Sequence, residues 1–134
     1  MRVLIDTSAW IEYLRATGSA AAVEVRRLLT SDTEIVVCEP IAMEILSGAV
    51  RADSYAKLQR LVDGLPSLKL DDTIDFRSAA AIFRNARLSG RTIRSVNDCL
   101  IAALAIRHDV ELVHSDADYD IIAGITPLKA RRLR

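Results

Sequence analysis

Several features of common protein classes are missing from this 134-residue chain. It has no run of 18 apolar residues, so no transmembrane helix is expected. Its opening residues lack the charged, apolar and small segments of a signal peptide. Glycine-rich nucleotide-binding motifs and the serine elbow of hydrolases are also absent. We therefore expect a cytoplasmic protein with no membrane partner.

Cysteine and histidine are scarce, with two residues of each. Cys38 and Cys99 lie inside apolar runs without CxxC spacing or a nearby histidine pair, which disfavours a disulfide or a zinc site. His108 and His114 follow a predicted helix and a predicted strand, and neither has an acid or nucleophile at a catalytic spacing. We expect both histidines to be surface or capping groups.

Charge is balanced but unevenly distributed, with 18 basic and 18 acidic residues. Residues 77–97 contain no acid and five arginines, namely Arg77, Arg84, Arg87, Arg91 and Arg94. After Asp120 the chain carries only basic charges, at Lys129, Arg131, Arg132 and Arg134. A solvated helix face and a frayed basic tail would explain the two stretches separately. Together they modestly favour a partner that carries phosphate groups.

The apolar pattern predicts strands that alternate with helices. Short apolar runs at 3–5, 35–37 and 112–113 are typical of buried strands, and a weaker run lies at 67–70. Helical periodicity covers residues 8–16, 19–30, 40–50, 53–63, 74–88 and 95–108. With no linker or repeat, this order predicts one α/β domain over residues 1–134, with a parallel sheet covered on both faces.

Four acids interrupt apolar surroundings. Asp6 ends the first predicted strand, Glu44 lies in an apolar helix, Asp98 begins the most apolar helix, and Asp116 follows another strand. Carboxyl ends of parallel strands are common ligand sites. A buried carboxylate needs a neutralising partner, which a shared cation would provide. Oxygen ligands without histidine or cysteine favour Mg²⁺ or Mn²⁺, and such sites suit phosphodiester hydrolysis.

Each acid also has a structural explanation. Ser95 and Ser115 precede Asp98 and Asp118 at the spacing of a capping box. Asp6 could simply end a strand, and Glu44 could face solvent. Thr7 and Ser8 suit helix capping, although hydroxyls beside a metal carboxylate also orient water or phosphate. Arg91 and Arg94, just before the Asp98 helix, are candidates for binding the backbone of RNA.

Four segments in this order carry a resemblance that spans nearly the whole chain: Leu4–Trp10, Glu39–Gly48, Asn97–Ala105 and Leu112–Tyr119. They resemble the PIN-domain family and, within it, the VapC-type toxins of prokaryotic toxin–antitoxin pairs. The resemblance implies a three-layer α/β/α fold with a mainly parallel sheet of four to five strands. It also implies a homodimeric toxin that cuts RNA with Mg²⁺ or Mn²⁺. A VapB-like antitoxin would inhibit this toxin, and the toxin would contact DNA only indirectly, through the antitoxin.

Carried over by position, the resemblance makes Asp6, Glu44, Asp98 and Asp116 the catalytic and metal-binding residues. Asp118 is then a possible further ligand, and Ser115 a hydroxyl that supports phosphate or metal-bound water, unless it is only a turn residue. Two other functions stay open from the residues alone. One is an RNA-binding or regulatory module of the same fold with little catalysis, and the other is a metal-dependent phosphatase.

Overall fold

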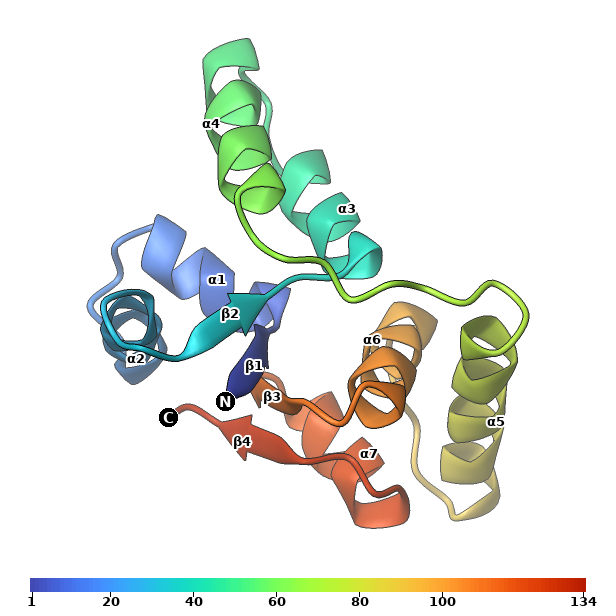
Figure 1. The fold of residues 1–134 in the computed structure, drawn as a ribbon. Helices are drawn as coiled ribbons and strands as arrows, with labels where there is room; N and C mark the ends of the chain where they lie inside the picture. The colour runs from blue at the N-terminus through green and yellow to red at the C-terminus, as the bar shows by residue number, and fades with distance from the viewer.

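The computed structural model describes residues 1–134 and is built on a four-stranded parallel sheet (Figure 1). The strands, in chain order, are β1 (Arg2–Ile5), β2 (Glu34–Val36), β3 (Glu111–His114) and β4 (Ala130–Arg132). Their order across the sheet is β2-β1-β3-β4, and Leu4 at the centre lies opposite Val36 in β2 and Leu112 in β3. Leu4 is fully buried, as expected for a strand covered on both faces.

Seven helices surround this sheet. They are α1 (Thr7–Leu14), α2 (Ala20–Leu29), α3 (Glu39–Ser47), α4 (Ala52–Asp63), α5 (Asp75–Leu88), α6 (Val96–Arg107) and α7 (Ala117–Ile125). Figure 1 shows α1 and α2 on one side of the sheet and α5, α6 and α7 on the other, while α3 and α4 project as a pair beyond β2. This arrangement confirms the expected three-layer α/β/α fold. None of the helices has both the length and the apolar character needed to cross a bilayer.

Helix α6 forms the centre of one helical layer, because it is apolar on almost every side. All of its residues from Asp98 to Ala105 are buried, and it packs against α5, α7 and α3. The helix that the sequence indicates as the most apolar is therefore a buried one. Its first turn therefore carries Asp98 into an interior position at the end of the sheet.

The fourth strand differs from the prediction. Residues 67–70 form no strand, and Ser67 makes only one parallel bridge, with Val37. Instead, β4 is formed by the C-terminal segment, for which a frayed basic tail was one of the two explanations considered. Leu112 N donates to Lys129 O at 2.8 Å, and Leu133 N donates to His114 O at 2.7 Å. Buried Leu128 and Leu133 flank the strand, which explains why so basic a segment is ordered.

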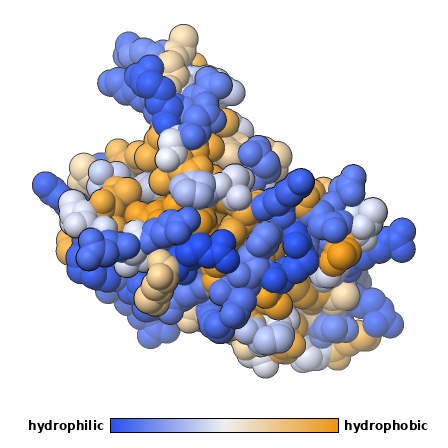
Figure 2. All heavy atoms as spheres, viewed as in Figure 1, coloured by the Kyte–Doolittle hydropathy of each residue, from blue (hydrophilic) through white to orange (hydrophobic).

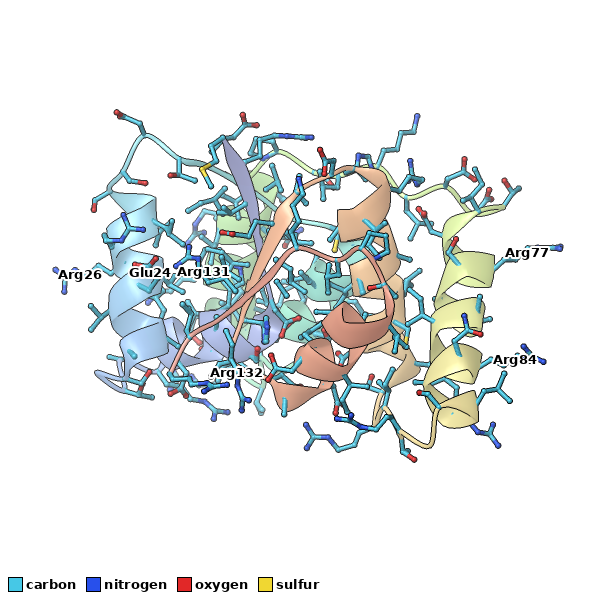
Figure 3. The ribbon with its side chains drawn as sticks, turned by 90° about the horizontal axis from the view of Figure 1, so that it is seen from below. Glu24, Arg26, Arg77, Arg84, Arg131 and Arg132 are labelled. Atoms are coloured by element: carbon cyan, nitrogen blue, oxygen red, sulfur yellow. The ribbon has the colours of Figure 1, made fainter.

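The basic charge of this tail is used within the fold. Arg131 lies beside Glu24 of α2 (Figure 3) and forms ion pairs with Glu24 and with Glu111 of β3. Arg132 pairs with Asp120 at 2.7 Å. The tail is therefore part of the sheet edge and is not a free basic arm.

The arginines of α5 differ from those of the tail. Figure 3 shows Arg77 and Arg84 pointing outward from α5 into solvent. This is the solvated helix face that the sequence allowed. Of the five arginines in the acid-free stretch, only Arg94 forms an ion pair.

Candidate metal centre

Asp6 is positioned by the end of β1 and the start of α1. Its backbone N–H donates to Val113 O at 2.9 Å, so the pairing of β1 with β3 extends to this residue. As the N-cap of α1, its Oδ2 accepts hydrogen bonds from Ser8 N at 2.9 Å and Ser8 Oγ at 2.6 Å. Asp6 is 4% exposed. The capping bonds fix its orientation and leave Oδ1 facing the interior.

The end of β3 brings Asp116 and Asp118 to the same edge of the sheet. Asp116 is the N-cap of α7 and accepts from Asp118 N at 2.9 Å. Ser115 N donates to Ser8 Oγ at 2.9 Å, which ties this loop to the loop after β1. The Ser115 hydroxyl donates to Leu133 O at 3.3 Å. Two neighbouring strand ends thus deliver three carboxylates, counting Asp6, to one place.

Asp98 approaches from the adjacent helical layer. It lies in the first turn of α6 and is 7% exposed. Tyr119 of α7 places its hydroxyl 2.7 Å from Asp6 Oδ1 and 3.3 Å from Asp98 Oδ1. The capping-box explanation for Asp98 is wrong, because the Ser95 side chain makes no capping hydrogen bond. Asp98 is therefore a buried acid that faces other acids.

Glu44 comes from α3 and borders the site from the outer side. Its Oε1 accepts a hydrogen bond from Thr7 Oγ1 at 3.1 Å, and the residue is half-buried. The neighbouring Met43 is 58% exposed, so the helix turns Glu44 inward and Met43 toward solvent. The alternative that Glu44 faces solvent is wrong. Thr7 orients this acid as Ser8 orients Asp6.

The carboxylates form a donor set suited to a hard cation. Oxygen atoms of Asp98, Asp116 and Asp118 lie within 4.8 Å of one another. Asp6 joins this cluster through Tyr119. Glu44 raises the pKa of Asp98, so it too lies within electrostatic range. The cluster contains no cysteine or histidine, so its chemistry fits Mg²⁺ or Mn²⁺ better than Zn²⁺.

Burial and mutual repulsion raise the pKa values of two of these acids. Burial, together with the charges of Asp6, Asp116, Glu44 and Asp118 in that order, raises the pKa of Asp98 to about 7. Burial also raises the pKa of Glu44, with Asp6 the main charged neighbour that contributes. A site that holds protons this strongly is short of positive charge, which is the condition that a bound cation relieves.

Arg94 supplies the one positive charge in contact with the acids. Its Nη2 lies 2.9 Å from Asp116 Oδ1, and its Nε lies 3.3 Å from Asp118 Oδ2. Its backbone N–H also donates to Asp118 Oδ2 at 3.1 Å. Arg91, the other arginine proposed to bind RNA, is exposed and forms no ion pair. The two arginines thus have different surroundings.

Two features of the site were not predicted. His114 is fully buried, which corrects the expectation of a surface group; its Nδ1 accepts from Asp116 N at 3.2 Å, and its Nε2 has no hydrogen-bond partner. Burial lowers the pKa of His114. Tyr119 was also missed as a site residue, although it lies three residues after Asp116, the spacing that puts two side chains on one helix face.

One further buried acid lies outside this centre. Asp75 accepts two hydrogen bonds of 2.7 Å from Arg107, through Nε and Nη2, and a third from Asp71 N at 2.8 Å. This arrangement lowers the pKa of Asp75. Asp75 is therefore fully neutralised within the protein and joins α5 to α6 as a structural ion pair.

Comparisons with known proteins identify the family of this chain. A family model described as PIN domain matches residues 3–125. The chain is 65% identical over 133 residues to Ribonuclease VapC11 of Mycobacterium tuberculosis, with 98% of this chain and 99% of the relative covered. It is 33% identical to Ribonuclease VapC18 of the same species, with 91% of this chain and 88% of the relative covered.

Solved structures share the fold at low sequence identity. VapBC-1 from nontypeable Haemophilus influenzae has a TM-score of 0.75 at 18% identity, with 98% of both chains covered. VapBC2 from Rickettsia felis, bound to a promoter DNA fragment, has a TM-score of 0.71 at 15% identity over the full length of both chains. The fold, the family match and the VapC relatives show that this chain belongs to the PIN-domain family, in its VapC branch.

Proposed function

We propose that this protein is a Mg²⁺- or Mn²⁺-dependent endoribonuclease and the toxin of a toxin–antitoxin pair. The observation that carries the proposal is the meeting of carboxylates from four separate parts of the chain: the ends of β1 and β3, and helices α3 and α6. Such a set has too little positive charge without a divalent ion. The relatives named as ribonucleases, 65% and 33% identical to this chain, support RNA as the substrate.

Each residue has a defined task in this proposal. Asp6, Glu44, Asp98 and Asp116 hold the ion, with Asp118 as a further ligand. When bound, the ion acts as a Lewis acid and lowers the pKa of water, which suits in-line attack on a phosphodiester. Tyr119, Ser8 and Thr7 fix the directions of the carboxylates through the hydrogen bonds described above.

The basic residues and Ser115 complete the proposed RNA-binding site. Arg91 and Arg94 precede α6 and can contact phosphate oxygens through paired N–H groups. Ser115 stands beside Asp116, and its backbone N–H is bonded to Ser8. In the proposed reaction these groups orient the backbone of RNA, while the carboxylates provide the metal-binding surface.

The proposed partners are a second copy of the chain and a VapB-like antitoxin. The antitoxin would bring the complex to DNA. We propose that the toxin acts in the cytoplasm. An apolar groove lies between α3, α5 and α6 beside the acids, lined by Pro40, Met43, Leu70, Phe76 and Leu100. Met43 and Phe76 are more than half exposed. Figure 2 shows apolar surface gathered below the hydrophilic tip of the α3–α4 pair. Size-exclusion chromatography with and without the co-expressed antitoxin tests both assemblies.

The decisive experiment is cleavage of a folded RNA pool by the antitoxin-free protein. Reactions contain Mg²⁺, Mn²⁺ or EDTA, and Asp98→Asn is compared with the wild type. Cleavage that requires metal and is lost in the variant supports the proposal. RNA binding without metal-dependent cleavage would instead support a binding or regulatory module. Turnover of a chromogenic phosphomonoester without RNA cleavage would indicate a phosphatase.

A further inference from the structure

Arg94 is the only cationic side chain within hydrogen-bonding distance of the candidate metal ligands. It touches Asp116 and Asp118, two of the three acids whose oxygens cluster within 4.8 Å. We propose that Arg94 is a built-in counter-ion that holds these acids when no metal is bound, leaves them when the ion binds, and then contacts the phosphate of the substrate. This inference rests on the proposed metal-dependent function.

Because the Arg94 side chain is exposed, its release from Asp116 and Asp118 costs little free energy. Its side chain is 73% exposed, whereas those of Asp116 and Asp118 are 23% and 7% exposed. An ion pair whose cation is exposed is easier to break than a fully buried pair, because water solvates the released guanidinium. A divalent ion among the same carboxylates attracts them more strongly than a guanidinium does and repels the guanidinium. The pair is therefore strong enough to form in the metal-free protein and weak enough to break.

The backbone around Arg94 is fixed, so only the side chain needs to move. Ile93 is 1% exposed and anchors the segment in the core. The Arg94 N–H donates to Asp118 Oδ2 at 3.1 Å, a bond that does not involve the guanidinium. After its release the guanidinium stays within one side-chain length of the acids. A phosphate bound there would be within reach of its paired N–H donors.

Arg91 provides a matched control. It lies three residues earlier in the same segment, is exposed, and pairs with no acid. The counter-ion role thus predicts opposite behaviour for the two arginines toward metal, although both are proposed to bind RNA. A general effect of lowering positive charge near the site would make the two behave alike.

The test is a titration of the purified protein with Mn²⁺, followed by electron paramagnetic resonance, for the wild type, Arg94→Gln, Arg94→Lys and Arg91→Gln. We expect Arg94→Gln to bind Mn²⁺ about three- to tenfold more tightly, because the competing cation is gone. Arg91→Gln and the charge-conserving Arg94→Lys should stay near the wild type. At saturating Mn²⁺, Arg94→Gln should raise the KM for RNA. Thermal unfolding in EDTA verifies that each variant is folded.

Unchanged or weaker Mn²⁺ binding by folded Arg94→Gln would overturn the counter-ion role. An equal gain in Mn²⁺ affinity in Arg91→Gln would also overturn the counter-ion role. Wild-type protein that binds Mn²⁺ but cuts no RNA would refute the ribonuclease proposal, and the titration would still decide the role of Arg94. Absence of Mn²⁺ binding in every variant would refute both.

Discussion

The hydroxyl of Tyr119 donates a 2.7 Å hydrogen bond to Asp6 Oδ1, joining residues 113 positions apart in the chain. The same hydroxyl lies 3.3 Å from Asp98 Oδ1, so one buried phenol lies between two acids from different layers of the fold. Burial and the adjacent acids raise the pKa of Tyr119 well above its usual value, and the phenol stays protonated. It therefore sets the distance between Asp6 and Asp98.

Replacing Tyr119 with phenylalanine tests this positioning role. The ring stays in the core, but Asp6 loses its only donor at Oδ1, which should cost about 1–2 kcal/mol of stability. We also expect Mn²⁺ binding to weaken several-fold, because the acids lose their fixed separation. Urea unfolding and Mn²⁺ titration measure the two effects. Tyr55→Phe, in a partly exposed residue of α4, is the control and should change neither.

The raised pKa of Asp98 predicts how stability depends on pH without metal. Between pH about 4 and pH about 7 the folded protein holds a proton that the unfolded chain releases, so stability falls as pH rises through this range. Asp98→Asn removes the effect and should be more stable than the wild type at pH 8 in EDTA, by up to about 4 kcal/mol, because the pKa of Asp98 rises from 3.8 to about 7. Saturating Mg²⁺ should reverse this order, because only the wild type gains a bound ion.

Thermal unfolding of both proteins from pH 4 to pH 8 measures this difference. His114 has a lowered pKa, so its contribution is lost as pH falls below its usual value near 6.5, opposite in sign to that of Asp98. Because both proteins retain His114, its contribution cancels when the variant is compared with the wild type at each pH. A difference that does not change with pH would contradict the assigned shift of Asp98.

Asp75 should behave as a structural acid. Its pKa is lowered by Arg107, so its stabilising effect is present above pH about 4 and is lost as pH falls below that value. Asp75→Asn leaves Arg107 without its ion pair and should cost about 3 kcal/mol in urea unfolding at pH 7. Mn²⁺ affinity of the folded variant should not change. Asp72→Asn, at an exposed position, is the control for stability. A loss of metal binding in Asp75→Asn would contradict the conclusion that Asp75 lies outside the metal centre.

The two arginines before α6 predict the salt dependence of RNA binding. Each contact to a phosphate of single-stranded RNA contributes about 0.7 to the slope of log affinity against log salt. The double variant Arg91→Gln/Arg94→Gln should therefore lower the slope by about 1.4 in the presence of metal. Arg77→Gln/Arg84→Gln, on the outer face of α5, is the matched control (Figure 3). Equal slopes for the wild type and the Arg91/Arg94 variant would exclude both residues from the RNA contact.

The sequence predicted the elements whose apolar pattern is strongest. Strands β1 and β3 and helix α6 were recognised because each has an uninterrupted run of buried apolar residues, namely Val3–Ile5, Leu112–Val113 and Cys99–Ala105. The acids stood out for the same reason, since a carboxylate among apolar neighbours is costly unless it has a purpose. Asp6, Asp98 and Asp118 are indeed buried. Whether these acids bind metal stays a prediction.

Strand β4 was missed because local pattern could not indicate it. Its sequence, Ala130–Arg132, is basic and carries no apolar alternation. It becomes a strand because β3 offers an unpaired edge and because Glu24, Glu111 and Asp120 neutralise its arginines. These partners lie 12 to 107 positions away in the chain. Residues 67–70, although they include Leu68 and Leu70, make only the single bridge to Val37 just after the edge strand β2.

The sequence by itself determined the fold class and the identity of the acids, because burial pattern and charge are local properties of the chain. Only the tertiary structure decided which groups contact these acids. Tyr119 bridges Asp6 and Asp98, and Arg94 pairs with Asp116 and Asp118, because the parallel sheet brings the ends of β1 and β3 together beside α6. Contacts of this kind form because the connections between parallel strands bring distant segments together, and the local spacing of residues does not show them.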